Sequence, residues 1–311
     1  MRKLKIAIIG CRNMGQKHLK TLRENFADTV EIVGILNSSL ASTKARAAEL
    51  DVPYFTSLDE INKKNVDAVI IATPGPTHAQ IGSEILLKGI PCLIEKPMAT
   101  TILGCDKLMK AAKSGGTTIV TGHVENYNPA VIRLKEELHA PVVSIKGIRT
   151  SRNSANKTGI SAIQELMVHD LAIVYSLLGD DLMTSVVHKR DDLSFENHAV
   201  VEMTYQNGAE VKLEALREDR EVERFMDIKD ANGNVFHIDF MDCRLVKNGE
   251  VLTEGGYPLK NEEENFINCV HKEQSPLVNM NEAKDIVKLC LDLEKGIKKR
   301  TPLVQTKQMS Y

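Results

Sequence analysis

Two groups of residues in this chain have the types and spacing that suit proton transfer at a carbon–oxygen bond. Lys96, in the run Glu95-Lys96-Pro97, directly follows the apolar stretch 90–94. An ammonium group at the carboxyl edge of a sheet, where ligands bind, can polarise the oxygen of an alcohol or ketone. Glu165 and His169 stand four residues apart in a predicted helix and therefore share a face. A carboxylate there would fix the imidazole tautomer and raise its basicity, which suits His169 to act as a general base.

Both groups also have an ordinary structural explanation. A lysine after a strand is often a solvated side chain, and a glutamate–histidine pair at this spacing is common on surface helices. The neighbours of the pair, Leu166, Met167, Val168 and Leu171, are apolar. We therefore place this helix face in the core or in the wall of a cleft, where a buried pair calls for a purpose.

The first apolar run, 4–9, leads into a glycine-containing turn, Gly10-Cys11-Arg12-Asn13-Met14-Gly15, and then into a helix beginning near Gln16. Two of the three glycines of a GxGxxG dinucleotide fingerprint are present in the required strand–turn–helix context. Arg12 replaces the middle glycine, which either blocks a pyrophosphate or adds a guanidinium that holds one, and we favour the second. The turn residues expected to bind NAD(P) are Gly10, Arg12, Asn13, Met14 and Gly15.

The end of the second predicted strand bears on the choice between NAD and NADP. A NAD-selective site places a carboxylate there on the ribose hydroxyls, whereas this chain has Asn37-Ser38-Ser39. Without that carboxylate, and with Arg12, Lys44 and Arg46 nearby in sequence, NADP is slightly favoured over NAD. A polar loop that tolerates either cofactor is the alternative. The remaining cofactor contacts are expected from Asn37, Ser38, Thr73, Pro74, His78, Glu95 and Lys96.

The elements that must position these residues follow two different patterns. Up to about Val120, short apolar runs alternate with amphipathic helical stretches, which is typical of a parallel sheet covered on both faces. Beyond about Gly122, strand patterns are joined by turn dipeptides such as Asn207-Gly208. We predict an α/β Rossmann domain with a doubly wound parallel sheet in residues 1–121. Residues 122–311 are predicted to form an α+β substrate-binding and oligomerisation domain with a large, mainly antiparallel open sheet, and a cleft between the domains is the expected active site.

The individual elements can be placed from the same patterns. Strands are predicted at 4–9, 31–36, 68–72, 91–94 and 118–120, and then at 142–150, 184–188, 198–205, 209–215, 225–230, 234–239 and 243–247. The clearest helices are predicted at 79–87, 103–112, 162–178, 262–271 and 281–295.

Composition argues against several other classes of protein. The 311 residues have room for two domains, and 40 Lys+Arg against 42 Asp+Glu give a net charge of -2, without the basic surface that nucleic acid requires. No apolar run approaches the roughly 20 residues of a membrane span. The six cysteines form no CxxC motif and no Cys/His cluster at metal-ligand spacing. We expect a soluble, cytoplasmic protein with reduced thiols and no metal.

The chain resembles the Gfo/Idh/MocA family of NAD(P)-dependent oxidoreductases, whose members act mostly on sugars, cyclitols and nucleotide-linked sugars. The resemblance implies that Lys96 lies near the reacting carbon and that His169 is the acid/base residue. It is carried by the turn 10–15 with His18, the segment 73–78, Glu95-Lys96-Pro97, the segment 122–129, the helix around 165–170, and Tyr257-Pro258-Leu259-Lys260.

The chain departs from this family pattern at three positions. Glu165 stands where relatives commonly have aspartate. The segment Gly122-His123-Val124-Glu125-Asn126-Tyr127-Asn128-Pro129 is similar to the GHVERFNP pattern of nucleotide-sugar 3-dehydrogenases, with Asn126 in place of arginine and Tyr127 in place of phenylalanine. The resemblance places Asn126, Tyr127 and His169 on the substrate side. If the family arginine serves an anionic substrate group, its replacement weakens the nucleotide-sugar assignment, and the later strands offer only scattered cations: Arg149, Arg152 and Arg217.

These features predict an enzyme that transfers a hydride between nicotinamide and a secondary alcohol or ketone of a sugar-like substrate. His169 would remove the hydroxyl proton while Lys96 stabilises the developing charge on oxygen. A non-catalytic cofactor-binding regulator is one alternative, and a reductase of a linear pigment or an unsaturated bond, which would not need the pair of Glu165 and His169, is another. A homodimer or homotetramer through the open face of the second sheet is expected.

Overall fold

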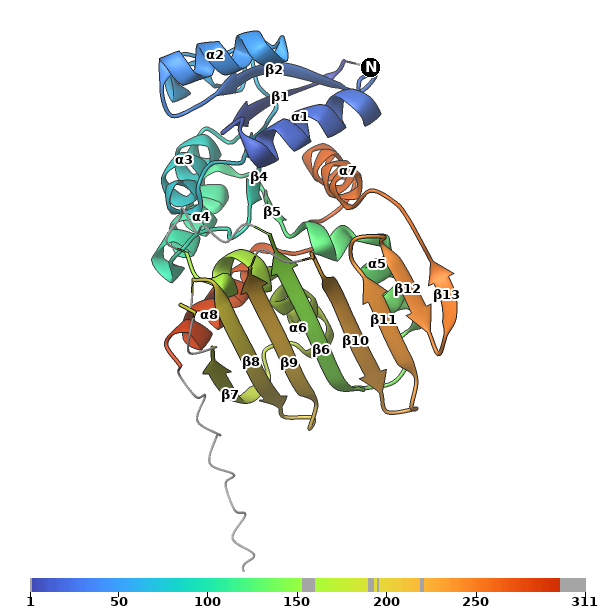
Figure 1. Ribbon diagram of the computed structural model, residues 1–311. Helices are drawn as coiled ribbons and strands as arrows, with labels where there is room; N and C mark the ends of the chain where they lie inside the picture. Colours follow the sequence, from blue (N-terminus) through green and yellow to red (C-terminus); the bar gives the residue numbers. More distant parts are fainter. Residues whose placement is uncertain (1, 153–159, 190–192, 195, 219–220, 297–311) are drawn as a thin grey trace, which may run out of the picture.

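The computed structural model describes residues 2–152, 160–189, 193–194, 196–218 and 221–296. Two sheets dominate the fold, and Figure 1 shows the smaller one above the larger one. No helix in these ranges is both long enough and apolar enough to cross a membrane.

The smaller sheet is parallel throughout, with strand order β2-β1-β3-β4-β5. Its Val/Ile runs are buried on both faces because consecutive side chains point to opposite sides. On one side, residues such as Ile9 and Ile71 pack on α3 and α4. On the other, Ile6 and Ile8 pack on α1 and on the late helix α7. The strands are β1 (Leu4–Ile9), β2 (Val30–Leu36), β3 (Ala68–Ile71), β4 (Cys92–Glu95) and β5 (Ile119–Gly122), and the helices are α1 (Asn13–Asn25), α2 (Leu40–Leu50), α3 (Gly75–Leu87), α4 (Ile102–Gly115) and α7 (Pro258–His271).

The larger sheet has the order β13-β12-β11-β10-β6-β9-β8-β7, and only β6 and β9 pair in parallel. Helices α5 (Pro129–Glu137), α6 (Val168–Leu178) and α8 (Met280–Glu294) pack on one face, whereas the other face carries polar residues such as Lys146 and Lys212. The strands are β6 (Val142–Ser151), β7 (Leu182–His188), β8 (His198–Tyr205), β9 (Glu210–Arg217), β10 (Arg224–Asp230), β11 (Val235–Asp239), β12 (Arg244–Lys247) and β13 (Glu250–Thr253). The predicted fold class is confirmed.

The helix predicted at 162–178 differs from the structure in its first part. Residues Ile163–Met167 form a π-helical segment, η3, and regular α-helix begins only at Val168. A π turn contains one more residue than an α turn, so it shifts every later side chain around the helix axis. This shift changes which residues meet in the cleft.

The division of the chain after residue 121 stays a prediction. Both the smaller sheet and the larger one contribute residues to one continuous core. Helix α7, far along the sequence, lies beside α1 and covers one face of the first sheet (Figure 1). The last part of the chain thus completes the packing of the first.

Candidate active site

A cleft lies where the carboxyl edge of the parallel sheet meets the start of β10 and the π-helical segment. Residues from both sheets line it, and they come from α1, the end of β4, η2 (Val124–Tyr127), β6, α6, β10 and the start of α7. Lys96 and His169 are both among the lining residues. The two groups selected from the sequence therefore do share one cleft.

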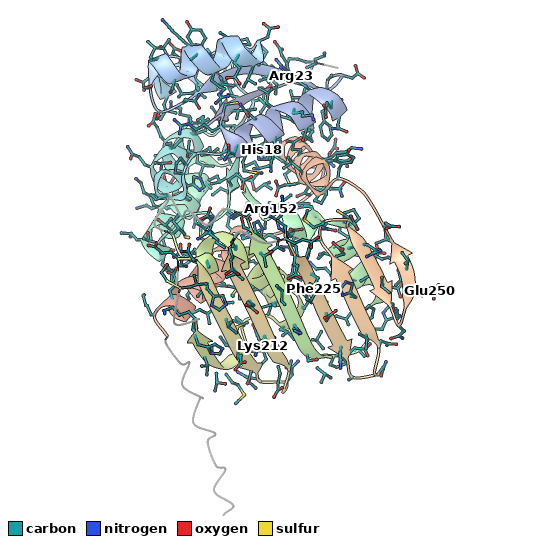
Figure 2. All side chains as sticks on the ribbon, in the orientation of Figure 1. His18, Arg23, Arg152, Lys212, Phe225 and Glu250 are labelled. Carbon is teal, nitrogen blue, oxygen red and sulfur yellow. The ribbon has the colours of Figure 1, made fainter. Side chains whose placement is uncertain are left out.

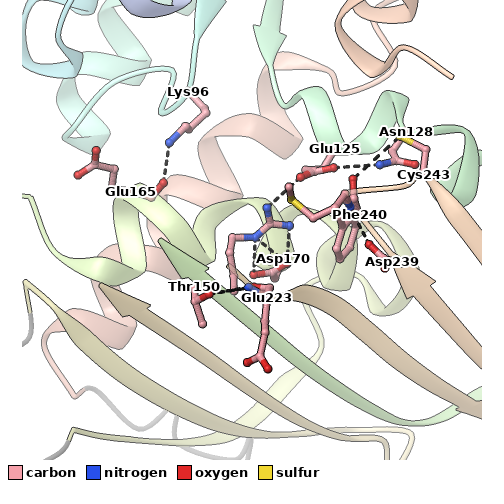
Figure 3. A network of polar contacts seen from close by, with 12 residues as sticks. Lys96, Glu125, Asn128, Thr150, Glu165, Asp170, Glu223, Asp239, Phe240 and Cys243 are labelled. Atoms are coloured by element: carbon pink, nitrogen blue, oxygen red, sulfur yellow. Dashed lines mark hydrogen bonds and ion pairs between the residues drawn. The ribbon is translucent and has the colours of Figure 1, made fainter. Parts of the chain in front are cut away.

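Lys96 reaches from the end of β4 toward Glu165 of the π-helical segment (Figure 3). Its Nζ donates a hydrogen bond of 2.6 Å to the backbone oxygen of Glu165, and its own backbone N–H donates to Glu95 Oε2 at 3.2 Å. Burial lowers the pKa of Lys96, and the negative charges of Glu95 and Glu165 oppose that shift. The lysine is thus held in place through a carbonyl group rather than neutralised by a direct ion pair with a carboxylate.

The predicted contact between Glu165 and His169 does not form. The π-helical backbone turns Glu165 away, and its carboxylate instead pairs with Arg217 of β9. His169 Nδ1 is buried and has no hydrogen-bond partner in the described residues. Burial, followed by the positive charges of Lys96 and Arg149, holds the pKa of His169 well below its usual range. His169 is therefore a neutral imidazole at neutral pH, and no carboxylate of the described residues orients it.

A buried ion cluster beneath the cleft was not found from the sequence. Arg149 Nη1 donates to Glu125 Oε1 at 2.8 Å, and its Nη2 and Nε donate to Asp170 at 2.9 and 3.0 Å. Figure 3 labels the two carboxylates, Glu125 and Asp170. The ring of Phe240 lies 4.8 Å from the guanidinium carbon. Both carboxylates of this cluster are thus occupied by one arginine. Asp170 directly follows His169, so the cluster anchors the helix that carries the histidine.

A second buried cluster joins the cofactor helix to the strand of Lys96. His18 of α1, labelled in Figure 2, lies between Glu263 Oε1, 2.9 Å from its Nδ1, and Glu95 Oε1, 3.0 Å from its Nε2. Although burial opposes the charged form, these two carboxylates raise the pKa of His18 to about 10. Burial raises the pKa of Glu263 to about 7 and that of Glu262 well above its usual range. Glu95, expected to contact the cofactor, is bound to His18 through Oε1 and also lines the cleft, so its cofactor contact stays a prediction.

The first turn has the geometry of a phosphate-binding turn. Gly10 adopts φ +90, and a Cβ on it would lie 2.6 Å from the backbone nitrogen of Thr73. A Cβ on Gly15 would lie 2.3 Å from the carbonyl oxygen of Gly10. No side chain caps α1, whereas Ser39 caps α2 and Thr101 caps α4. The amino-terminal N–H groups of α1, around Asn13 and Met14, therefore fit an anion such as a pyrophosphate.

The other expected cofactor residues lie around the same edge of the sheet. Asn37 Oδ1 accepts a hydrogen bond of 2.8 Å from the backbone N–H of Cys11, so Asn37 stabilises the turn. Arg12 and Ser38 are exposed. His78 lies between the carbonyl oxygens of Thr73 and Pro97, at 2.7 and 2.9 Å. It thereby ties the loop of Thr73 and Pro74 to the residue after Lys96.

Asn126 and Tyr127 lie outside the lining of the cleft that Lys96 and His169 share. Asn126 is buried, and its Oδ1 accepts a hydrogen bond from Lys135 Nζ at 3.4 Å. The hydroxyl of Tyr127 donates to Asn265 Oδ1 at 3.0 Å. Neither residue lines the cleft of His169. Both side chains contact residues of neighbouring helices, Lys135 of α5 and Asn265 of α7, so their expected role on the substrate side stays a prediction that this geometry does not support.

Comparison with known proteins agrees with this geometry. Residues 4–123 match the Gfo/Idh/MocA family model, described as an oxidoreductase family with an NAD-binding Rossmann fold. The UDP-N-acetylglucosamine 3-dehydrogenase of Acidithiobacillus ferrooxidans is 27% identical over 231 residues, which cover 72% of this chain and 71% of the relative. An inositol 2-dehydrogenase of Paracoccus denitrificans is 29% identical over 188 residues, which cover 57% of this chain and 55% of the relative.

A solved structure extends the likeness to nearly the whole fold. The UDP-N-acetylglucosamine 3-dehydrogenase GnnA from Acidithiobacillus ferrooxidans superimposes with a TM-score of 0.86 at 24% identity, over 96% of this chain and 98% of that one. At this identity the superposition establishes the arrangement of both sheets.

Proposed function

Because residues 4–123 match the model of the Gfo/Idh/MocA oxidoreductase family with its NAD-binding Rossmann fold, we propose that the protein is a nicotinamide-dependent dehydrogenase of a sugar, cyclitol or nucleotide sugar. One observation carries the proposal. Lys96, from the nucleotide-binding sheet, and His169, from a helix of the second domain, line the same cleft. An amine and a neutral imidazole on one cleft suit the oxidation of a secondary alcohol.

The chain's own residues supply binding and proton transfer. The uncapped amino terminus of α1 and the turn at Gly10 would hold the pyrophosphate. When bound, nicotinamide supplies the hydride acceptor or donor. His169 takes the hydroxyl proton because it is neutral at neutral pH. Lys96, aimed by its contact with the Glu165 carbonyl, stabilises the charge that develops on the substrate oxygen.

The test is a substrate panel with a lysine variant. Sugars, inositols and nucleotide sugars are incubated with NAD and with NADP, and formation of reduced nicotinamide is followed by absorbance. We expect turnover with at least one compound and a loss of at least about 100-fold in kcat for Lys96→Met, while cofactor binding measured by fluorescence stays within about threefold. Full activity in Lys96→Met would remove this lysine from the mechanism. No turnover of any compound would favour the regulatory alternative.

We also propose that the site accepts both cofactors, with NADP slightly favoured. The end of β2 carries Asn37 and Ser38 in place of a carboxylate, and exposed Arg12 stands at the start of α1. Arg46 is already paired with Glu49 at 2.8 Å, so Arg12 is the better candidate for a 2′-phosphate. Because Arg12 is also expected to contact the pyrophosphate that both cofactors share, Arg12→Ser should raise the Kd of NADP by roughly tenfold and that of NAD by clearly less. An equal effect on both cofactors would contradict this assignment.

A further inference from the structure

Arg224 differs from the other arginines with a buried, unpartnered Nε because its guanidinium has no hydrogen-bond or ion-pair partner in the described residues. In the part of the chain that the structure describes, three arginines have a buried Nε without a hydrogen-bond partner: Arg133, Arg224 and Arg244. Arg133 still forms ion pairs with Glu136 and Glu137 through its terminal nitrogens, and Arg244 forms them with Asp239 and Glu254. Within the described residues, Arg224 has no side-chain hydrogen bond or ion pair, and it alone of the three lines the cleft.

The sheet explains why Arg224 is left without a partner. Arg224 is the first residue of β10 and lies directly opposite Arg149 of β6 in the antiparallel register. Directly opposite residues point to the same face of a sheet, so two cations lie side by side. The carboxylates whose charges act on Arg224 are Glu125 and Asp170. Arg149 donates hydrogen bonds to both of them, at 2.8 to 3.1 Å.

The guanidinium of Arg224 thus has N–H donors without acceptors, and Arg224 lines the cleft. A partly buried guanidinium without acceptors is unfavourable unless a ligand or water supplies them. Arg224 is near enough to His169 that its charge contributes to lowering the pKa of that histidine. Because Arg224 and His169 line the same cleft, a substrate bound at His169 can also reach the free guanidinium.

We propose that Arg224 binds an anionic group of the substrate, a carboxylate or a phosphate, next to the carbon oxidised at His169. The inference rests on the proposed dehydrogenase function. Planar guanidinium groups bind both anions through paired hydrogen bonds. The arginine missing at position 126 is thus replaced from another element, and Asn126 no longer argues against an anionic substrate.

The experiment compares charged and neutral members of matched compounds. The phosphate arm uses UDP-N-acetylglucosamine and N-acetylglucosamine, and the carboxylate arm uses glucuronate and glucose. Steady-state kcat and KM are measured for the wild type, Arg224→Gln, Arg224→Lys and the control Arg133→Gln, whose residue lies on α5 outside the cleft. Arg224→Gln should lower kcat/KM for the preferred anion by roughly 10- to 100-fold, mainly through KM. Arg224→Lys should recover part of the loss, and Arg133→Gln should match the wild type.

The outcomes separate this inference from the proposed function. If the wild type oxidises neutral and charged members alike and Arg224→Gln has no selective effect, the enzyme stands and the anion site is refuted. If no compound is turned over, the proposed function fails. Calorimetric binding of the same four compounds to the cofactor-loaded protein then tests the anion site by itself. Binding of an anionic member that is weakened in Arg224→Gln supports the site. Absent binding, or binding that Arg224→Gln does not change, overturns it.

Discussion

His18 connects three parts of the molecule through one imidazole ring. Its helix begins at the cofactor turn, Glu95 precedes Lys96, and Glu263 belongs to α7. Glu262, beside this ring, is fully buried and neither of its carboxylate oxygens has a hydrogen-bond partner in the described chain. An imidazolium at this point offsets carboxylates that would otherwise be costly to bury. The position of Lys96 thus depends on a charge in the first helix.

Replacing His18 should destabilise the protein and disturb the chemistry. His18→Gln leaves buried carboxylates without a cation, and we expect a loss of about 3–5 kcal/mol in the free energy of unfolding. The exposed His139 provides a control, since His139→Gln removes a histidine without touching the cluster. Urea denaturation followed by circular dichroism measures the difference. Equal stability of the two variants would mean that the cluster is held by protonated carboxyls alone.

The same histidine predicts how stability varies with pH. Its pKa is raised from 6.5 to about 10 in the folded protein. The folded state therefore retains a proton that the unfolded chain releases, so the contribution is complete below pH 6.5 and is lost as pH rises toward 10. We expect the free energy of unfolding of the wild type to fall by a few kcal/mol across this window. The slope should be much smaller in His18→Gln, and an unchanged slope would assign it to another group.

Lys96 should set the alkaline limit of alcohol oxidation. Burial lowers its pKa from the ordinary 10.5, and the protonated amine is the form that stabilises oxygen charge. The value of kcat/KM should therefore decline at high pH with an apparent pKa below 10.5. Lys96→Arg, which stays protonated, should shift that limb upward in pH. If kcat/KM declines at the same pH in the wild type and in Lys96→Arg, a group other than Lys96 controls the alkaline decline.

At the scale of elements, sequence patterns located strands better than the contacts that complete the site. Strands β1 and β8 have the predicted bounds because their Val-, Ile- and Ala-rich runs are buried. Strand β13 was missed, although Asn248-Gly249, with φ of 52 and 89, is a turn signal of the kind that joins hairpins. The π turn at Ile163–Met167 was missed as well, because it shifts backbone hydrogen bonds without altering the apolar pattern.

The two buried ion clusters could not be predicted from local sequence patterns, because their members are far apart in the sequence. Arg149 lies 24 positions from Glu125 and 21 from Asp170, and His18 lies 245 positions from Glu263. Periodicity places each residue on an element, but only the packing of elements decides which charges meet. Lys96 and His169 could be selected because each stands at the end or on one face of a single element.

The cofactor turn gives a prediction that belongs to the element as a whole. A Cβ at position 15 would lie 2.3 Å from the Gly10 carbonyl oxygen, so Gly15→Ala must displace α1 from the turn. Because the free N–H groups at the start of α1 are the expected phosphate donors, we expect at least a tenfold rise in the Kd of NAD(P) and a loss of about 1–3 kcal/mol in stability. Fluorescence titration and thermal unfolding measure both. Wild-type affinity would place the pyrophosphate elsewhere.

At the scale of the whole molecule, the two sheets are covered unequally. Helices cover both faces of the parallel sheet, but among the described residues the larger sheet has helices on one face only (Figure 1). Its other face mixes lysines and carboxylates with exposed Val186, which is 48% exposed, and Val235, which is 40% exposed. Such a face, with both charges and apolar side chains, suits contact with a second copy of itself.

We therefore expect a dimer or tetramer that assembles through this open face. Val186→Asp places a charge within the expected contact and should shift the assembly toward monomer, as measured by light scattering over a range of concentrations. Leu103, on α4 and 80% exposed, offers a matched control, since Leu103→Asp changes an exposed apolar residue outside the sheet. A wild type that is monomeric at every concentration, or equal dissociation in both variants, would place the contact elsewhere. Because the open face lies on the side opposite the packed helices and away from the cleft residues, the monomeric variant should keep the kcat of the wild type.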